Sequence, residues 1–471
     1  MPAGAPGERL FGLGLLVTAA SFYALAWLAP FSPADAALFL LLVALTSQRI
    51  RPFLLVLAAS VQDAPGLGYL WSYVCFAGVA ALLVGTYVLR RVSAGGARFD
   101  PDFERLAAFA LVVVAYAVVM SALQARLHGY AQADDRPFLA VGGLMAVMIV
   151  TGYVAGAVIG SDAADRKRLG LLSIGALAHA LLVGALQIPF GQAFYRSGEN
   201  LSKVEQSHQL VEEGALGFAR INGPFLSPNA FGYTVLLLAL VAAIVLWRSA
   251  RTRAFFVYAI AGGAAVMLSL SKALLGYFGL AVLVLFRYAA GRLATAIAVF
   301  AGLAGLAVLM SSHLYQIMLA VFRVQEGGLG SRQYAWLAVL RELQPLDWIF
   351  GVGLGAWPVF FEDHVGIPLS DPHSLPLSVA GTFGLVGVLF YVFLVSTLAR
   401  GLARARDDAD RVAVYLLLLL FLLKDLVSIP AVLGNTPLTF FVWLLLGLAI
   451  GRWQDAAVRA QAAGPPVPAR G

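Results

Sequence analysis

Three short stretches of the sequence place cationic or imidazole side chains directly before apolar segments. The reactive residues are Arg220 in "ARINGPFLSPNAFGY", Arg332 in "GGLGSRQYAWLAVLREL" and His373 in "DPHSLPLSVAGTFG". The planar guanidinium group of arginine binds phosphate through paired hydrogen bonds, and a neutral imidazole accepts a proton near neutral pH. These residue types fit phosphate binding combined with general-base catalysis, provided that the fold brings them together.

Two of these stretches also have a plain structural explanation. Pro228 and Asn229 are typical of the first turn of a helix, so they need no functional role. Arg332 follows the glycine-rich "EGGLG" and stands in the first turn of an expected helix, with Ser331 as its N-cap. Free N–H groups at such a helix start favour phosphate. A solvated arginine on a surface helix, with Trp336 at the membrane interface, explains the same spacing.

Other polar residues at apolar boundaries also have open roles. His373 alone among the six histidines is tied to a sharp polar-to-apolar boundary, where packing or solvation explains it as well as catalysis does. Lys272, in the "SLSK" turn, reaches either the interface or a phosphate. Lys424 and Asp425 interrupt an apolar segment near its end, where intramembrane charges are either functional or reach the interface. No HExxH motif occurs and the carboxylates of the expected outer segments are scattered along the chain, so no metal site is expected.

The elements that position these residues belong to a membrane protein. Of the 471 residues, 61% are hydrophobic and 12% are charged, against roughly 25% charged residues in an average soluble domain. Apolar runs of about 20 residues, long enough to cross the hydrocarbon layer, recur along the whole chain. The only cysteine is Cys75, so an internal disulfide is excluded. We expect residues 1–471 to form a single all-α polytopic membrane domain, with the first apolar run retained as a helix rather than cleaved as a signal peptide.

The apolar runs predict about 12 to 14 transmembrane helices. The segments 33–47 and 52–62 are short for spans, and they are also compatible with one re-entrant hairpin. The expected helices are 10–30, 33–47, 52–62, 69–89, 104–122, 138–160, 169–189, 227–247, 254–270, 273–286, 293–312, 376–398, 412–428 and 438–451.

The basic residues predict the orientation of these helices. Most of the 32 Lys and Arg residues fall in alternate connections, and cytoplasmic loops carry an excess of such residues. We therefore expect both termini in the cytoplasm, which accounts for the net charge of +7 without nucleic-acid binding. Arg220 then lies on the side where arginine is scarce, and helix-start chemistry does not explain it.

This orientation leaves two long segments on the outer side of the membrane, at 190–226 and 313–375. Connections between elements usually have about 4–6 residues, so segments of this length are expected to be functional. The second segment should contain short helices, one of them at 331–343. The tail at 456–471, rich in alanine and proline, is expected to be disordered and cytoplasmic.

In their order along the chain, four stretches resemble the motifs of the bacterial O-antigen ligase and O-antigen polymerase superfamily. They are "RINGPFLSPNAFGY", "SLSK", "GSRQYAWLAVLRELQPLDWIFGVGLGAW" and "DPHSLPLSVAGTFGLVGVLF", all within about 218–398. The resemblance implies that Arg220 and Arg332 hold a diphosphate and that His373 activates an acceptor hydroxyl. Lys272 stands where family members usually have arginine, which removes the bidentate geometry. Candidate orienting or supporting residues in these stretches are Asp371, Ser374, Asn222 and Asn229.

The resemblance also implies a reaction. A glycan would pass from undecaprenyl diphosphate to an acceptor sugar hydroxyl at the periplasmic face of the bacterial inner membrane, with inversion and without a metal or cofactor. Ligation of O-antigen to lipid A-core is the first expectation, and polymerisation of a carrier-linked glycan is the alternative within the superfamily. A lipid-linked oligosaccharide flippase or transporter is the alternative from another class, because Lys424, Asp425 and the glycine-rich 259–265 lie in apolar segments.

Overall fold

The computed structural model describes a large part of the chain, and within that part every regular element is a helix and no strand occurs. The described residues are 43–45, 50–60, 78–86, 101–127, 138–190, 221–225, 228–247, 250–269, 271–291, 294–295, 299, 331–366, 371–372, 374–405, 408–421, 432–434 and 438–449.

The helix bounds follow the apolar runs closely. The labelled helices are α3 (Arg51–Ser60), α5 (Pro101–Leu127), α6 (Phe138–Ser161), α7 (Ala163–Phe190), α9 (Pro228–Trp247), α10 (Arg251–Ser269), α11 (Lys272–Ala290), α14 (Ser331–Glu342), α15 (Pro345–Phe350), α16 (Trp357–Val365), α17 (Leu375–Arg404) and α18 (Asp408–Leu419). A further helix comprises Leu438–Ala449.

Six of the described helices are long and apolar enough to cross a membrane: α5, α6, α7, α9, α10 and α17. Shorter apolar helices occur at Arg51–Ser60, Leu274–Ala290 and Leu438–Ala449. These helices confirm the prediction of an all-α, multi-pass membrane protein. The predicted span 10–30, and most of 33–47, 69–89 and 293–312, lie outside the described residues, so the count of 12 to 14 stays a prediction.

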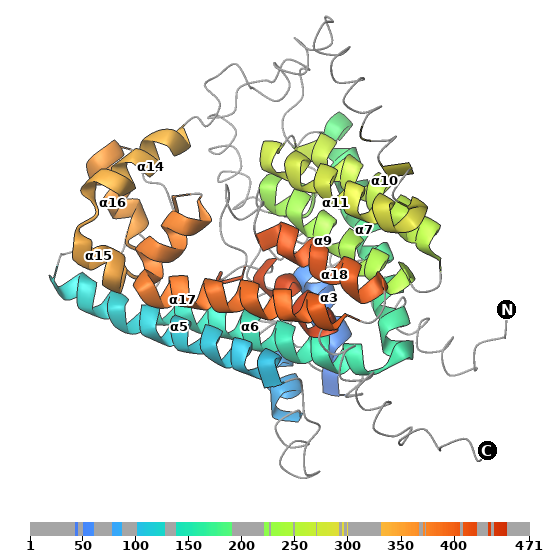
Figure 1. The fold of residues 1–471 in the computed structure, drawn as a ribbon, viewed down its shortest axis with the longest axis horizontal. Helices are drawn as coiled ribbons and strands as arrows, with labels where there is room; N and C mark the ends of the chain where they lie inside the picture. The colour runs from blue at the N-terminus through green and yellow to red at the C-terminus, as the bar shows by residue number, and fades with distance from the viewer. Residues whose placement is uncertain are drawn as a thin grey trace, which may run out of the picture.

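Eight of the described helices form a closed ring of neighbours. Along the order α5, α6, α7, α9, α10, α11, α18 and α17, each helix packs on the next, and α17 packs back on α5. Figure 1 shows α5 and α17 running side by side across the molecule. Among the six long apolar helices α9 is the most deeply buried, and it also contacts α11 and α18.

Two glycines allow the helix Leu438–Ala449 to lie directly against α6. A Cβ atom added at Gly152 would stand 2.7 Å from Trp443 Cβ, and one added at Gly156 would stand 2.9 Å from the Cα atom of Gly447. Small residues four positions apart let helix backbones approach closely in a membrane, where packing rather than water drives association. The "GYVAG" of α6 is therefore a helix-packing motif that the sequence reading missed.

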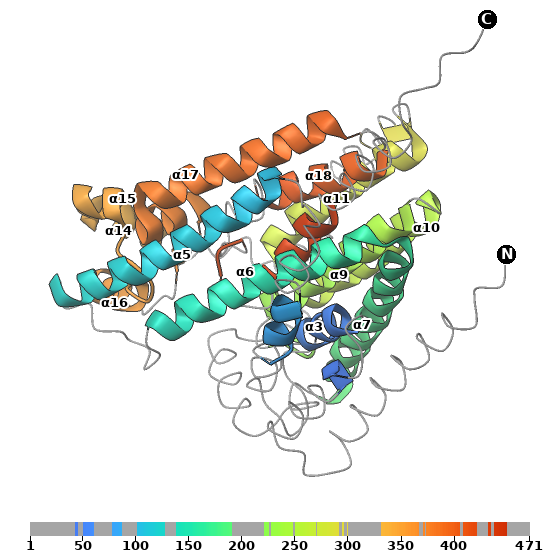
Figure 2. The same cartoon turned by 90° about the horizontal axis from the view of Figure 1, so that it is seen from below.

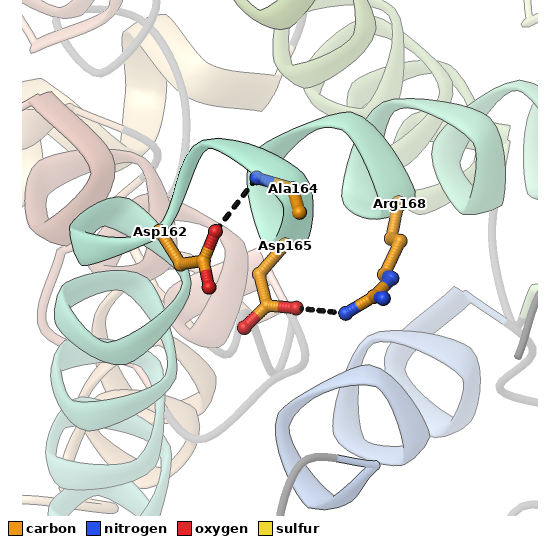
Figure 3. Close-up of polar contacts among 4 residues, drawn as sticks. All are labelled: Asp162, Ala164, Asp165 and Arg168. Atoms are coloured by element: carbon orange, nitrogen blue, oxygen red, sulfur yellow. Dashed lines mark hydrogen bonds and ion pairs between the residues drawn. The ribbon is translucent and has the colours of Figure 1, made fainter. Parts of the chain in front are cut away.

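The connection between α6 and α7 is a single residue, which corrects the expected start of α7 at 169. Asp162 Oδ1 accepts a hydrogen bond from the Ala164 N–H at 2.7 Å and so caps the helix. Arg168 forms an ion pair of 2.6 Å with Asp165 on the next turn, and Figure 3 shows both contacts. The basic residues predicted for a loop thus lie on the first turns of α7, which turns steeply away from α6 in Figure 2.

Helix α3 is an interior element, since all ten of its residues are buried. Arg51, which falls between the expected helices 33–47 and 52–62, is also buried. Its guanidinium group donates to the carbonyl oxygens of Ala44 at 2.9 Å and Leu82 at 3.1 Å. A buried arginine is tolerated when its N–H groups find acceptors, so Arg51 ties three short helical pieces together.

The short helices α14, α15 and α16 gather at the end of the bundle where α5 ends and α17 begins (Figure 1). The helix predicted at 331–343 is confirmed as α14. It shares a small apolar core with α16. This core consists of Ala335, Val339, Leu343, Val352, Ala356, Trp357, Phe360 and Phe361.

Candidate functional site

The predicted site residues differ in how far the structure describes them. Arg220 and His373 lie outside the described residues. Arg332 and Lys272 are described only by their backbone, each in the first turn of a helix. Asn222, Asn229, Asp371 and Ser374 are described in full. The site is therefore built from the contacts of the residues that flank the predicted cations and histidine in the chain.

A backbone hydrogen bond joins the first stretch to the "SLSK" turn. The Ile221 N–H donates to the Leu268 carbonyl oxygen at 2.9 Å. Ile221 follows Arg220 directly, and Leu268 lies four residues before Lys272. Two stretches that are far apart in the sequence, each with a predicted phosphate-binding cation, thus meet at the end of α10.

Gln187, near the end of α7, holds the turn that follows Ile221. Its Oε1 atom accepts from the Gly223 N–H at 2.9 Å, and its Nε2 atom donates to the Gly223 carbonyl oxygen at 3.2 Å. Gly223 has a φ of +53°, and a Cβ atom there would stand 2.5 Å from the ring of Phe231. Asn222 in the same turn is completely buried. Sequence reading missed Gln187, whose only signal is an amide in an apolar run.

Asn229 lies half-buried in the first turn of α9, which begins at Pro228. This position confirms the helix-start interpretation of both residues. Asn222 is buried in the turn that precedes α9.

A side-chain hydrogen bond joins the second and third stretches. The indole N–H of Trp336 donates to the Pro372 carbonyl oxygen at 2.7 Å. Trp336 lies one helical turn after Arg332, so the two positions share a face of α14. Pro372 directly precedes His373 in the chain. The contact brings the Arg332 turn of α14 to the backbone beside His373, although 36 residues separate Trp336 from Pro372.

Asp371 is tied to the first turn of α17. Its Oδ1 atom accepts a hydrogen bond from the Ser378 hydroxyl at 2.8 Å. Ser374 is buried at the N-cap position of α17, and its carbonyl oxygen accepts from the Ser378 N–H at 2.7 Å. The negative carboxylate therefore lies near a helix N-terminus, which favours it electrostatically. Ser378 was not among the predicted residues, although it lies within the same stretch.

The glycine-rich loop "GVGLGA" docks into a break in α17. Gly384 has a φ of 62° and a ψ of −154°, which interrupts the helix. The carbonyl oxygens of Gly381 and Thr382, freed by the break, accept from the N–H groups of Val352 at 2.7 Å and Gly353 at 3.1 Å. Backbone groups in a membrane need hydrogen-bond partners within the protein. The loop supplies the N–H groups and the broken helix supplies the carbonyl oxygens.

Helix α5 holds the other side of this loop. The Tyr116 hydroxyl donates to the Phe350 carbonyl oxygen at 2.9 Å, and the Gln124 amide donates to that of Gly351 at 3.1 Å. Ser121 Oγ accepts from the Leu354 N–H at 2.6 Å. Three polar side chains of α5 thus hold the loop on one side, and backbone carbonyl oxygens of α17 hold it on the other. The sequence signal for this contact was the spacing of three glycines in "GVGLG".

Comparisons of the chain with protein-family models, with curated proteins and with solved structures found no match. The contacts just described are therefore the observations that bear on function. They join four separate stretches into two pairs, one containing Arg220 and Lys272 and the other containing Arg332 and His373.

Proposed function

We propose that this protein is a membrane glycosyltransferase that moves a glycan from undecaprenyl diphosphate to an acceptor sugar hydroxyl. The observation that supports this proposal most directly is the hydrogen bond from Trp336 to Pro372. It brings a helix turn with a phosphate-binding residue type, Arg332, to the chain position before a potential base, His373. Neither partner of that bond needs to be near the other for α14 or α17 to form.

The proposed reaction is a single displacement. The acceptor hydroxyl oxygen attacks the anomeric carbon as the bond from that carbon to the diphosphate oxygen breaks, and undecaprenyl diphosphate leaves with the electron pair. Neutral His373 accepts the hydroxyl proton. Arg220, Arg332 and Lys272 offset the negative charge that develops on the diphosphate, which is the role of preorganised cations in such steps. Attack from the opposite face inverts the anomeric configuration, and neither a metal nor a cofactor takes part.

The proposed acceptor is lipid A-core, which makes the enzyme an O-antigen ligase. A polymerase of the same superfamily would use the same donor residues and a second carrier-linked glycan as acceptor. The proposed location is the bacterial inner membrane, and the distribution of basic residues supports an orientation with both termini in the cytoplasm and the site on the periplasmic side.

The test is glycan transfer by the purified protein in the presence of EDTA, with undecaprenyl diphosphate-linked glycan as donor. His373→Ala should lower kcat by roughly 100- to 10,000-fold, the usual contribution of a general base. The matched control is His364→Ala. His364 is exposed on α16, with its Nδ1 atom 2.8 Å from the Phe360 carbonyl oxygen, and its loss should leave the rate unchanged.

Three outcomes would contradict the proposal. His373→Ala could transfer glycan at the native rate, His364→Ala could be equally inactive, or transfer could require a divalent ion. Lipid A-core and a second carrier-linked glycan, supplied as alternative acceptors, distinguish the ligase from the polymerase by the product formed.

The break in α17 is a described feature that favours a transporter or flippase instead, since transporters place interrupted helices at their substrate sites. In this chain Val352 and Gly353 occupy the freed carbonyl oxygens, which leaves them unavailable to an ion or substrate. A flippase would move the lipid-linked glycan across a vesicle membrane without forming a new glycosidic bond. Such movement in the absence of any transfer product would favour this second candidate.

A further inference from the structure

Helix α15 exposes apolar side chains, although it belongs to a segment that the sequence places outside the membrane. The exposed fractions are 61% for Leu346, 48% for Ile349 and 45% for Phe350. Isolated exposed apolar residues are common on soluble surfaces, but a cluster on one short helix requires an explanation. The contacts of α15 with two membrane-spanning helices show at what depth this cluster lies.

Helix α5 gives the first measure of depth. The Phe350 carbonyl oxygen accepts its hydrogen bond from Tyr116, and the apolar run of α5 continues for seven residues beyond Tyr116, to Leu123. At a rise of about 1.5 Å per residue, Tyr116 lies roughly 10 Å inside that end of the apolar run. The end of α15 therefore lies beside the membrane-spanning part of α5.

Helix α17 gives an independent measure. The Ile349 carbonyl oxygen approaches Gly384 so closely that a Cβ atom there would collide with it. The apolar part of α17 starts at Pro376. Gly384 lies eight residues later, and this separation corresponds to roughly 12 Å along a helix. The next residue, Leu385, is exposed, as are Val388 and Leu389 one turn further. Exposed apolar side chains therefore occur both on α15 and on the part of α17 that begins at its contact with α15.

Four successive backbone N–H groups after α15 find acceptors within the protein, as a membrane requires. The N–H groups of Gly351, Val352, Gly353 and Leu354 donate in turn to the Asp347, Gly381 and Thr382 carbonyl oxygens and to Ser121 Oγ. At the other end of α15, the Asp347 carboxylate accepts from the Gln344 N–H at 3.2 Å. Exposed Arg341 and Glu342 precede this end, as expected of a polar interface.

We propose that α15 is inserted into the bilayer, with Leu346, Ile349 and Phe350 in contact with lipid acyl chains. The insertion is in the leaflet on the side of α14–α16, and the helix enters and leaves on that side without crossing the membrane. This assignment concerns the bilayer itself and is independent of the proposed transfer reaction.

Spin labels test the proposal in the full-length protein. In a Cys75→Ala background, nitroxides are attached to Leu346→Cys and Ile349→Cys, and the protein is reconstituted in phospholipid nanodiscs. Oxygen concentrates in acyl chains and a water-soluble nickel chelate is excluded from them, so oxygen should relax both labels severalfold more strongly than the chelate. Exposed Val119→Cys on α5 is the lipid-facing control, and exposed Asp363→Cys on α16 is the water-facing control.

Values at Leu346→Cys and Ile349→Cys that match Val119→Cys support insertion. Values that match Asp363→Cys overturn it, because the side chains would then lie in water. Spin–spin broadening at both positions, with neither reagent reaching the labels, also overturns it, because a second copy of the chain would then cover α15. All four substituted residues are exposed, so the substitutions disturb no packed core.

Discussion

At the scale of single residues, Trp336 shows how one side chain can link two predicted motifs. A tryptophan on a helix beside a membrane is usually interpreted as an interfacial anchor. Here its N–H group is engaged by the Pro372 carbonyl oxygen, so the residue connects α14 to the start of α17. Asp371, one residue earlier, is held by Ser378. Both contacts restrict the backbone that flanks His373.

Trp336→Phe should slow transfer roughly tenfold while the protein remains folded. Phenylalanine keeps the aromatic contact but lacks the indole N–H group. The net contribution of a hydrogen bond is about 1 to 1.5 kcal/mol. The effect should appear mainly in kcat, because the hydrogen bond positions Pro372, the neighbour of His373, and does not bind the undecaprenyl diphosphate-linked glycan. Steady-state kinetics measures it, and Trp348→Phe on α15, outside this hydrogen bond, is the control. Equal rates for both variants would refute the positioning role.

At the scale of elements, the break in α17 and the loop 351–356 are mutually dependent. Gly351, Gly353 and Gly355 have φ values of 81°, 84° and 80°, which residues with a side chain rarely adopt. Gly353 must also lie against Ser121 of α5, where an added Cβ atom would stand 2.6 Å from Oγ. The loop therefore requires glycine for two separate reasons, which are the positive φ values and the close approach of Gly353 to α5.

Gly353→Ala and Gly355→Ala separate these two reasons. Nothing lies within 4 Å of a Cβ atom added at Gly355, so that variant should lose only the backbone term, about 1 to 2 kcal/mol. Gly353→Ala should lose more, because its methyl group also displaces α5. Thermal unfolding in nanodiscs measures both, and transfer should fall only for Gly353→Ala. Equal destabilisation of the two variants would indicate that α5 moves away from the added methyl group at no energetic cost.

The packing of α6 on Leu438–Ala449 gives another prediction at this scale. Gly156→Ala should destabilise the protein by about 1 to 3 kcal/mol, the usual range for an overpacked contact. Gly143→Ala, on the same helix but with nothing within 4 Å of the added Cβ atom, should be neutral or stabilise by up to about 1 kcal/mol because alanine favours the helix. Chemical or thermal unfolding compares them. A neutral Gly156→Ala would disprove the close packing.

At the scale of the whole molecule, the ring of helices gathers several hydrogen-bonding side chains at one end of the bundle. The contacts of Tyr116, Ser121, Gln124 and Thr382 all lie where α5 ends and α17 begins. The ion pair of Arg168 with Asp165 lies instead in the first turns of α7. Figure 2 shows that α6 starts on the side of α14–α16, where α5 ends, and runs to the far side of the molecule. Because α6 is long and apolar enough to cross a membrane, the α6–α7 turn and the α14–α16 end should lie on opposite sides of the membrane.

A membrane-impermeant maleimide tests this arrangement in intact cells. In a Cys75→Ala background, Asp363→Cys on α16 should be labelled from the periplasm, whereas Lys167→Cys on α7 should be labelled only after the cells are opened. Both side chains are exposed, so differences in burial do not explain the result. The opposite labelling pattern would reverse the predicted orientation and place the site in the cytoplasm.

The sequence by itself determined the architecture and most helix bounds. Runs of about 20 apolar residues must form helices in hydrocarbon, because only helices satisfy their own backbone there. Pro228 and the glycine-rich approach to Ser331 marked helix starts that the structure confirms. The start of α7 was wrong by six residues, because Asp162 caps the helix before the charged cluster. Hydropathy alone assigns such a cluster to a loop.

Only the tertiary structure decided which stretches meet. Gln124 and Gly351 are 227 residues apart, and no local propensity indicates that one donates to the other. The same holds for Ile221 with Leu268, and for Trp336 with Pro372. Hydropathy and helix preference are set by neighbours in the chain, whereas a polar partner is set by how the helices pack. The residue types therefore predicted a chemistry, and the packing decided which of them could share a site.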